Sequence, residues 1–358
     1  MTEKIKIRFA IVGCGRISKR HGELLGLNQI KNASLVAVCD INMDKAKTLG
    51  NQFNLPYYTD MDEMMSKENI DIVSVLTESG NHAKHVINLA KYGKNIIVEK
   101  PMALTIDDAD DMIMACQKHN CRLFVVKQNR FNVPVVKLKE ALDNQRFGKL
   151  FMATVRLRWC RDAEYYNQAP WRGTWAMDGG VLTNQASHHI DLLEYMMGRV
   201  DSVYAKGIKA LANIEAEDTA AVILKFRNGG IGIIEATTAV RPRDLEGSLS
   251  ILGEKGTVEI GGFAVNKMLH WNFQEKLDGD DEVFEKYSVN PPNVYGFGHQ
   301  AYYDHVIDCI LNNKEQMVGG LEGRKSVELI SAIYESMETR KEVFLRFKPE
   351  HCKLGGRL

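Results

Sequence analysis

The sequence predicts an α/β protein with two domains: a parallel sheet covered by helices in residues 1–128, and an α+β domain with a mostly antiparallel sheet in residues 129–358. The length of 358 residues exceeds what one ordinary hydrophobic core supports. The first third alternates short apolar runs with helical patterns, whereas later segments alternate apolar and polar residues one by one. These three observations give the fold class and place the domain boundary near Gln128–Val133.

Composition narrows the classes of function. The chain has 46 Lys and Arg against 46 Asp and Glu, so it lacks the basic surface expected for nucleic acid or for a membrane. No run approaches the roughly 20 apolar residues of a membrane span, and the charged N-terminus does not resemble a signal peptide. The seven cysteines are scattered without a CxxC pair, which favours reduced thiols. We therefore expect a cytoplasmic protein with no metal, no nucleic acid and no membrane partner.

The first domain is predicted from short runs rich in Val, Ile and Ala that alternate with helical segments. Strands are predicted at Lys6–Val12, Ser34–Cys39, Ile70–Leu76, Asn95–Val98 and Cys121–Val126. Helices are predicted at Arg16–Leu27, Met43–Phe53, His82–Tyr92 and Ile106–His119. Such runs are typical of a parallel sheet that is buried on both faces. Ligands of these sheets bind beyond the carboxyl ends of the strands.

The second domain is predicted to have a sheet with one open face. Along Leu150–Trp159, apolar residues alternate with Thr154, Arg156 and Arg158, which is the pattern of a sheet covered on one side. Further strands are predicted at Val203–Ile208, Thr219–Phe226, Ile231–Ala236, Ser248–Leu252 and Thr257–Ile260. Helices are predicted at Val181–Met197, Ala301–Asn312 and Gly323–Glu338. Short turns between the strands favour antiparallel pairing.

A glycine motif follows the first predicted strand. The segment Gly13–Ser18 reads GCGRIS, the GxGxxG spacing with serine in the last position. A strand before it and a helix after it are the context of a Rossmann dinucleotide site. Gly13 permits the tight turn, and Gly15 lets the backbone approach a pyrophosphate at the helix N-terminus.

An acidic residue ends the second predicted strand. Asp40 stands 25 positions after Gly15, where an acid can bond both hydroxyls of the adenosine ribose. No arginine occurs in residues 41–44, so a 2′-phosphate would meet this carboxylate without compensation. NAD is therefore expected rather than NADP, although an aspartate that only closes a strand-end turn would look the same.

A lysine ends the predicted strand Asn95–Val98. Lys100 follows Glu99 and precedes Pro101, which lacks an N–H and turns the chain out of the sheet. The alternative interpretation is a solvent-exposed lysine at a strand end that takes no part in the chemistry, and for an isolated lysine this would be preferred. Here the residue lies at the carboxyl edge of a parallel sheet, where chemistry is expected.

A second group of polar residues lies on the predicted helix Val181–Met197. At about 100° per residue one face is apolar: Leu182, Ala186, Ile190, Leu193 and Met197. The opposite stripe is polar: Asn184, His188, Asp191 and Tyr195. His188 belongs with this stripe, whereas His189 falls beside the apolar face and is expected to pack. A solvated face is the alternative, but such faces usually carry Lys and Glu, whereas these groups suit a hydroxylated ligand.

These motifs resemble a known family. Residues 99–101 match the active-site lysine motif of the glucose–fructose oxidoreductase / inositol dehydrogenase (Gfo/Idh/MocA) family, and residues 179–191 match its GG…HxxD helix. Residues 129–131 and 171–172 match two further segments, so the resemblance spans essentially the full chain. It implies NAD as cofactor and Lys100 and His188 as catalytic residues. Asn184 stands where inositol-type members carry Asp, so their full proton relay is not implied.

Five blocks are more similar to one branch of the family: residues 124–130, 171–175, 184–188, 251–258 and 295–299. They resemble the UDP-N-acetyl-2-amino-2-deoxyglucuronate 3-dehydrogenases. This implies oxidation of the sugar C3 hydroxyl of a UDP-sugar uronate during assembly of bacterial surface polysaccharides, by a homotetramer. A dehydrogenase of free inositols or hexoses and a non-catalytic NAD-binding sensor are the alternatives. Two routes for the reoxidation of NADH stay open: NADH is released from the enzyme, or a second substrate such as 2-oxoglutarate oxidises it there.

The resemblance also implies contact residues. For the cofactor these are Gly13, Gly15, Arg16, Ile17, Asp40, Thr77, His82, Glu99, Gln128, Trp171 and Arg172. For the substrate these are Lys127, Asn129, Arg130, Asn184, Gln185, Tyr165 and His299. Lys127 is the expected partner of the uronate carboxylate, because a buried charge without a partner is costly. His188 is expected to act as the base and Lys100 to orient the hydroxyl.

Overall fold

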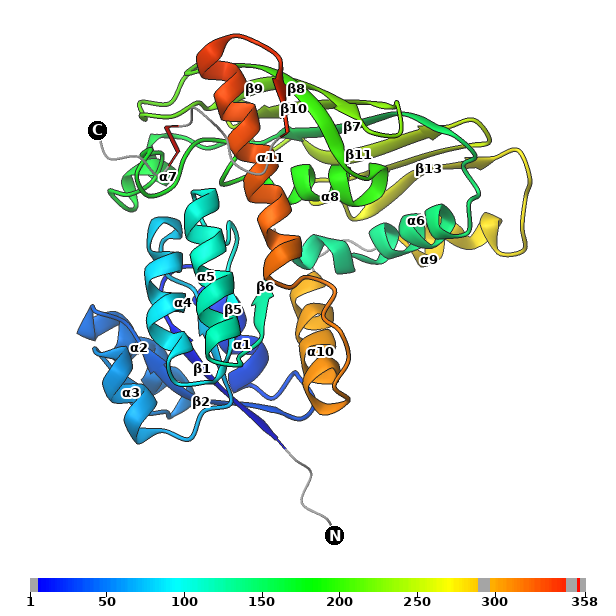
Figure 1. The fold of residues 1–358 in the computed structure, drawn as a ribbon. Coiled ribbons are helices and arrows are strands. Elements are labelled where there is room, and N and C mark those ends of the chain that lie inside the picture. The colour runs from blue at the N-terminus through cyan, green and yellow to red at the C-terminus, as the bar shows by residue number, and fades with distance from the viewer. Residues whose placement is uncertain (1–5, 289–296, 346–352, 355–358) are drawn as a thin grey trace. The chain divides into compact units, whose positions relative to one another are not determined.

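The computed structural model describes residues 6–288, 297–345 and 353–354 (Figure 1). The chain forms two compact units. The first runs to Val126 and takes in His299–Val327, and the second comprises Lys127–Gly298 and the chain from Glu328 onward. The sequence assigned residues 299–327 to the second domain, but here they belong to the first unit. Of the motif block 295–299, residues 295 and 296 lie outside the described residues.

The first unit contains a six-stranded sheet in the order β3-β2-β1-β4-β5-β6, whose strand pairs are parallel. Its strands are β1 (Ile7–Val12), β2 (Ala33–Cys39), β3 (Tyr57–Tyr58), β4 (Ile72–Val75), β5 (Asn95–Val98) and β6 (Leu123–Val125). Its helices are α1 (Ser18–Gly26), α2 (Met43–Phe53), α3 (Met61–Lys67), α4 (His82–Ala90), α5 (Ile106–Lys118) and α10 (Gly298–Leu311), with a 3-10 turn η1 (Ser79–Asn81). The predicted strands and helices are all present. The short elements β3 and α3 were not predicted, because they offer too few residues for a periodic pattern.

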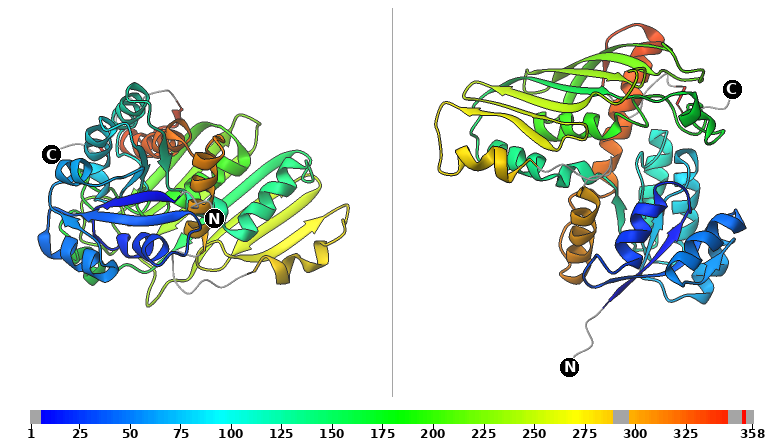
Figure 2. Two further views of the ribbon diagram at one scale, coloured as in Figure 1. Left: turned by 90° about the horizontal axis from the view of Figure 1, so that it is seen from below. Right: turned by 180° about the vertical axis from the view of Figure 1, so that it is seen from behind.

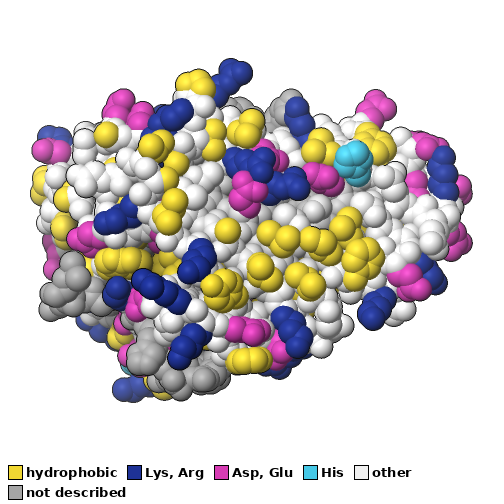
Figure 3. All heavy atoms as spheres, turned by 90° about the horizontal axis from the view of Figure 1, so that it is seen from above, with side chains coloured by type: hydrophobic (Ala, Val, Ile, Leu, Met, Phe, Trp, Pro, Cys, Tyr) yellow, Lys and Arg dark blue, Asp and Glu magenta, His cyan; other side chains and the backbone are white. Residues whose placement is uncertain are grey.

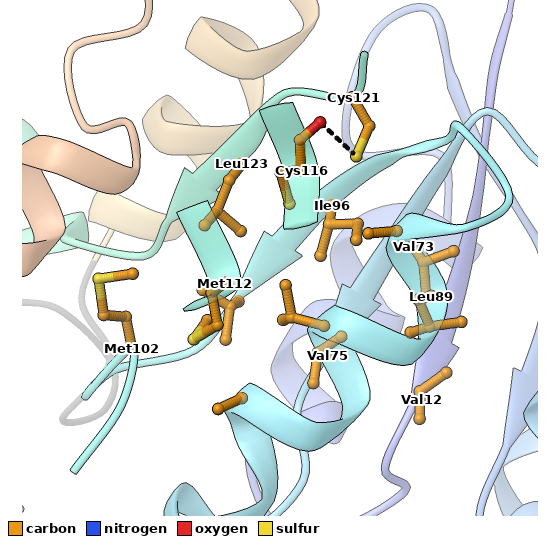
Figure 4. Packing of buried hydrophobic residues seen from close by; sticks show 14 of the residues in the cluster. Val12, Val73, Val75, Leu89, Ile96, Met102, Met112, Cys116, Cys121 and Leu123 are labelled. Carbon is orange, nitrogen blue, oxygen red and sulfur yellow. Dashed lines mark hydrogen bonds between the residues drawn. The ribbon is translucent and has the colours of Figure 1, made fainter. Parts of the chain in front are cut away.

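One face of this sheet packs against α4 and α5. Successive residues of a strand point to opposite faces. Val12 of β1, Val75 of β4 and Ile96 of β5 belong to a buried cluster with Leu89 of α4 and Met112 of α5 (Figure 4).

The other face packs against α1 and α10. The ring of Phe9 on β1 meets Tyr303 of α10 edge to face, with ring centroids 5.6 Å apart. His21 of α1 reaches the same tyrosine, with Nδ1 2.6 Å from the hydroxyl. Both faces are covered, which explains why the strands are rich in apolar residues throughout.

The second unit contains an eight-stranded sheet in the order β13-β12-β11-β7-β10-β9-β8-β14. Among the described strands of this second sheet, only β7 and β10 pair in parallel. The strands are β7 (Leu150–Arg158), β8 (Val200–Ile208), β9 (Thr219–Phe226), β10 (Ile231–Thr237), β11 (Glu246–Gly253), β12 (Gly256–Gly261), β13 (Lys267–Phe273) and β14 (Val343–Phe344). The helical elements are η2 (Gln128–Phe131), α6 (Val133–Asp143), α7 (Ala163–Asn167), α8 (Ser187–Met197), η3 (Asp280–Glu282) and α9 (Val283–Lys286), and α11 (Gly320–Thr339) continues into this unit from the first.

This sheet has one covered and one open face, as the alternation along β7 predicts. Val155 and Leu157 of β7 are buried, and α8 packs against this strand. The ribbon is seen from below and from behind in Figure 2. On the opposite face Ile223 and Ile231 are 57% and 50% exposed. The view from above shows a row of hydrophobic side chains with charged side chains around it (Figure 3). In the part of the chain that is described, no helix is long and apolar enough to cross a membrane.

Candidate functional site

The turn after β1 fits a dinucleotide pyrophosphate. Gly13 has a φ of +97°, and a Cβ there would lie 2.7 Å from the main chain of Leu76 and Thr77, so only glycine fits. Gly15 is exposed, and a Cβ there would meet nothing within 4 Å. The buried hydroxyl of Ser18 donates to Gly15 O over 2.6 Å and closes the turn at the start of α1. The turn therefore leaves its main chain open to an approaching phosphate.

Asp40 follows β2 and reaches this turn. Its Oδ2 accepts the N–H of Cys14 and its Oδ1 accepts that of Asn42, both over 2.8 Å. The bond to Asn42 is that of an Asx turn, so the carboxylate does close a strand-end turn. Each oxygen keeps further acceptor capacity for ribose hydroxyls, since the side chain is only half-buried. Of the other predicted cofactor contacts here, Arg16 is exposed and Ile17 half-buried.

Lys100 follows β5 and is half-buried. Its N–H donates to Glu99 Oε2 over 2.8 Å, and Glu99 Oε1 lies 3.1 Å from His21 Nε2 and 3.7 Å from His299 Nε2. Burial opposes the charge of Glu99, but the hydrogen bond from His21 and the nearby His299 imidazole outweigh burial and hold the pKa of this carboxyl well below its usual value. Glu99 was predicted to contact the cofactor and His299 the substrate. Both are buried against each other inside the first unit, so either contact would require the side chain to leave its present partners.

His82 connects the ends of two strands. Its Nδ1 lies 2.7 Å from Pro101 O and its Nε2 lies 3.0 Å from Thr77 O. Burial lowers the pKa of this imidazole. A carbonyl oxygen only accepts, so a neutral ring can donate to one of these two oxygens. Both ring nitrogens nevertheless face the main chain, and His82 lies between the segments after β4 and β5.

In the second unit, the polar stripe of α8 faces η2 and not solvent. Arg130 donates to both oxygens of Asp191, over 2.8 and 2.7 Å, and Lys127 Nζ lies 3.6 Å from the same carboxylate. These three side chains are each 3% exposed. Burial lowers the pKa of Lys127, and the charge of Asp191 opposes that shift. The guanidinium of Arg130 also lies over the ring of Tyr195, 4.2 Å from its centroid. The alternative of a solvated helix face is therefore wrong.

The two neighbouring histidines differ as the helical period predicts. His188 Nε2 lies 2.9 Å from Gln128 Nε2. Both ring nitrogens of buried His189 lack a hydrogen-bond partner among the described residues, and its ring meets Trp159 edge to face. Burial lowers the pKa of His189 to about 4, so this ring is neutral near pH 7. His189 is a packing residue, and His188 belongs to a polar network.

Predicted ligand contacts from three segments meet in the second unit. Tyr165 OH accepts Arg172 Nη1 over 2.5 Å and Gln185 Nε2 over 3.2 Å. The Arg172 guanidinium lies over the rings of Tyr165 and Trp171, at 4.3 and 5.0 Å from their centroids. Of the remaining predicted substrate residues, Asn129 is half-buried in η2.

The helix that carries His188 begins later than predicted. It starts at Ser187 rather than Val181, and residues 181–186 form hydrogen-bonded turns. In these turns Asn184 Nδ2 donates to Asp178 Oδ1 over 2.5 Å. The glycine pair before these turns packs against a residue that is distant in the sequence.

That distant residue, Glu217, was missed by the sequence analysis. Its Oε1 accepts the N–H of Leu182 and the hydroxyl of Tyr334, each over 3.0 Å, whereas Oε2 has no hydrogen-bond partner among the described residues. A Cβ at Gly180 would lie 2.2 Å from Oε2 and from the main-chain oxygen of Glu217, so the second glycine of the pair is required. Burial raises the pKa of Glu217 to about 7 against these hydrogen bonds. No local pattern marks this residue, because its contacts come from tertiary packing.

Both units match one described family. Residues 7–127 match the oxidoreductase family with a NAD-binding Rossmann fold, and residues 139–345 match the C-terminal alpha/beta domain of the same family. The chain belongs to the Gfo/Idh/MocA oxidoreductase family. The resemblance inferred from the motifs is thereby confirmed, as are the oxidoreductase class and the NAD-binding domain.

Several relatives refine this assignment. The WlbA dehydrogenase from Bordetella pertussis, solved in complex with NADH and UDP-GlcNAcA, is 41% identical, with 97% of this chain and 99% of that chain covered and a TM-score of 0.92. The WlbA dehydrogenase from Chromobacterium violaceum, solved with the same two ligands, is 40% identical, with 98% of each chain covered and a TM-score of 0.90. Myo-inositol 2-dehydrogenase of Thermotoga maritima is 30% identical over 260 residues, which cover 70% of this chain and 74% of that protein.

Proposed function

We propose that this oxidoreductase oxidises the sugar C3 hydroxyl of UDP-N-acetyl-2-amino-2-deoxyglucuronate (UDP-GlcNAcA) to the 3-keto product, using NAD. One observation supports this most strongly: the chain is similar, over nearly its whole length, to two dehydrogenases solved with NADH and UDP-GlcNAcA. The cellular role would be the biosynthesis of bacterial surface polysaccharides, in the cytoplasm.

The reaction requires that the hydroxyl lose its proton as the hydride leaves. The turn Gly13–Ser18 and Asp40 would hold NAD, which accepts the hydride on its nicotinamide ring when bound. An imidazole suits proton removal at neutral pH. We assign this role to His188 and propose that the Lys100 ammonium orients the hydroxyl and stabilises the alkoxide that forms.

Gln128 can decide which nitrogen of His188 is basic. Its amide lies 2.9 Å from His188 Nε2, and its amide oxygen has no hydrogen-bond partner among the described residues. The two amide orientations differ only in which atom faces the imidazole. With the oxygen toward Nε2–H, the lone pair that takes the proton is on Nδ1, and the same bond persists in the imidazolium.

The uronate carboxylate is proposed to interact with Lys127 and Arg130. Both cations already contact Asp191, so the substrate would share them with a protein carboxylate. The affinity gained would then be smaller than from an exclusive buried pair. Tyr165, Asn184 and Gln185 carry hydroxyl and amide groups that suit the sugar hydroxyls and the acetamido group.

The test is NADH formation followed by absorbance, with UDP-GlcNAcA, uncharged UDP-N-acetylglucosamine and myo-inositol as substrates. A parallel series contains 2-oxoglutarate in case NADH stays bound. We expect UDP-GlcNAcA to react much faster than the other two. Comparable turnover of the uncharged sugar would contradict the proposed role of the carboxylate, and faster turnover of myo-inositol would establish the polyol dehydrogenase alternative.

Two further possibilities are tested by the same protein preparation. The polyol alternative rests on the 30% identity to a myo-inositol 2-dehydrogenase, and no NADH from any substrate would favour a non-catalytic NAD sensor. We also propose a homotetramer, which exposed side chains such as Ile223 and Ile231 on the open sheet face support. Analytical ultracentrifugation measures this directly.

A further inference from the structure

A chain of buried hydrogen bonds in the first unit ends on the main chain of Lys100. Tyr303 OH lies 2.6 Å from His21 Nδ1, and His21 Nε2 lies 3.1 Å from Glu99 Oε1. Glu99 Oε2 in turn accepts the N–H of Lys100 over 2.8 Å. Ser74 Oγ, in the middle of β4, lies 3.3 Å from the Tyr303 hydroxyl. Ser74, His21 and Tyr303 are fully buried, and Glu99 is 5% exposed.

For a neutral His21, the hydrogens of this hydrogen-bond network have one consistent arrangement. A main-chain N–H can only donate, so the ionised Glu99 carboxylate accepts at both oxygens. His21 then donates from Nε2 and, as a neutral ring, accepts the Tyr303 hydroxyl at Nδ1. Burial keeps the pKa of His21 below its ordinary value, which agrees with a neutral ring. His299 adds a second imidazole beside the carboxylate, with its ring 5.2 Å from that of His21.

The residues of this hydrogen-bond network come from different helices and strands of the first unit. His21 lies on α1, the helix that begins at the dinucleotide turn, and Tyr303 lies on α10, in the segment that returns to the first unit. Glu99 directly precedes Lys100 at the end of β5. A charged carboxylate is costly to bury, and packing alone would be served better by an apolar side chain. The hydrogen bond from the Lys100 N–H to this carboxylate indicates that the charge of Glu99 holds the main chain at Lys100 in place.

We propose that His21, Glu99 and Tyr303 are positioning residues for Lys100, and that they connect the helix that receives the dinucleotide to the lysine that acts on the substrate. This inference rests on the proposed function for the role of Lys100. A displacement of about 1 Å can lower a rate about 100-fold. Loss of these hydrogen bonds should therefore lower kcat by about 10–100-fold, with little change in KM for the sugar or in Kd for NAD.

Paired variants of His21 separate positioning from packing. His21→Gln retains one donor and one acceptor, whereas His21→Leu retains neither. We expect kcat of His21→Gln to stay within about threefold of the wild type and kcat of His21→Leu to fall by the larger factor. Tyr303→Phe should also lower kcat, and it keeps the test open if His21→Leu does not fold. Tyr302→Phe is the matched control, because Tyr302 lies beside Tyr303 with rings 5.9 Å apart but is not a member of the chain described above.

Lys100 provides a readout that needs no substrate. Reductive ¹³C-methylation of the NAD-loaded protein gives an NMR signal for each lysine, and Lys100→Arg assigns the relevant one. The signal should coincide in the wild type and His21→Gln and be displaced in His21→Leu. If the wild type fails to oxidise UDP-GlcNAcA, the proposed function falls, but this comparison still tests the network.

Two results would overturn the proposal. One is an equal loss of kcat in His21→Gln and His21→Leu with an unchanged Lys100 signal, because the hydrogen bonds would then be irrelevant to the lysine. The other is a stoichiometric metal ion found by mass spectrometry in the purified protein and lost in His299→Leu. The ligating atoms of His21, Glu99 and His299 lie within 4.8 Å of one another, and a metal held there would replace the hydrogen bonds on which the inference depends.

Discussion

Replacement of Glu217 by glutamine should change how stability depends on pH. Below about pH 4.5, the usual pKa of a glutamate, the carboxyl is protonated in both the folded and the unfolded chain. As the pH rises to about 7, the unfolded chain ionises while the buried carboxyl stays protonated, so the folded state loses stability. A shift from 4.5 to about 7 corresponds to about 3 kcal/mol at 1.36 kcal/mol per unit. Glu217→Gln does not titrate and should escape this loss.

The assay is urea unfolding of both proteins between pH 4.5 and 8, followed by tryptophan fluorescence. The four tryptophans lie in the second unit, so the signal follows the unit that contains Glu217. We expect the free energy of unfolding of Glu217→Gln to rise relative to the wild type by about 3 kcal/mol up to pH 7 and then to level off. The glutamine oxygen can still accept from Leu182 and Tyr334, which limits any loss that does not depend on pH.

The control is Glu285→Gln, the same substitution at an exposed glutamate of α9, and the pH dependence at Glu217 is measured as its excess over this control. A pH-independent difference at Glu217 would contradict the reasoning. So would a wild type that gains stability relative to the variant as the pH rises, because the carboxyl would then be ionised in the folded protein.

Further predictions concern the proposed reaction. Asp40→Ala should weaken NAD binding by about 1–3 kcal/mol in a calorimetric titration, and NADP binding as tight as that of NAD by the wild type would contradict the selecting role of this carboxylate. His188→Asn and Lys100→Met should each lower turnover by about 10²–10⁴-fold while NAD stays bound; a near wild-type rate for either variant removes that residue from the mechanism, and His189→Asn is the mild control. Lys127→Ala should narrow the preference for UDP-GlcNAcA over the uncharged sugar in kcat/KM, and an unchanged ratio would assign the uronate to other cations.

The sequence by itself determined the features that depend on local pattern. The strand–turn–helix around Gly13 and Gly15 was predictable because a φ of +97° and a close approach to Leu76 require glycine there. The parallel sheet followed from apolar runs separated by helices, and so did the position of Lys100 just beyond the carboxyl end of β5. Helical periodicity distinguished His188 from His189, because side chains 100° apart on a helix meet different surroundings.

The tertiary structure decided which distant side chains meet. The sequence placed Asp191 on a polar stripe, but only packing shows that the stripe is buried against Arg130 and Lys127. Likewise, His299 joins Glu99 because residues 299–327 return to the first unit. Charges and hydrogen bonds act over a few ångströms whatever the separation along the chain, and no local period encodes which elements come that close.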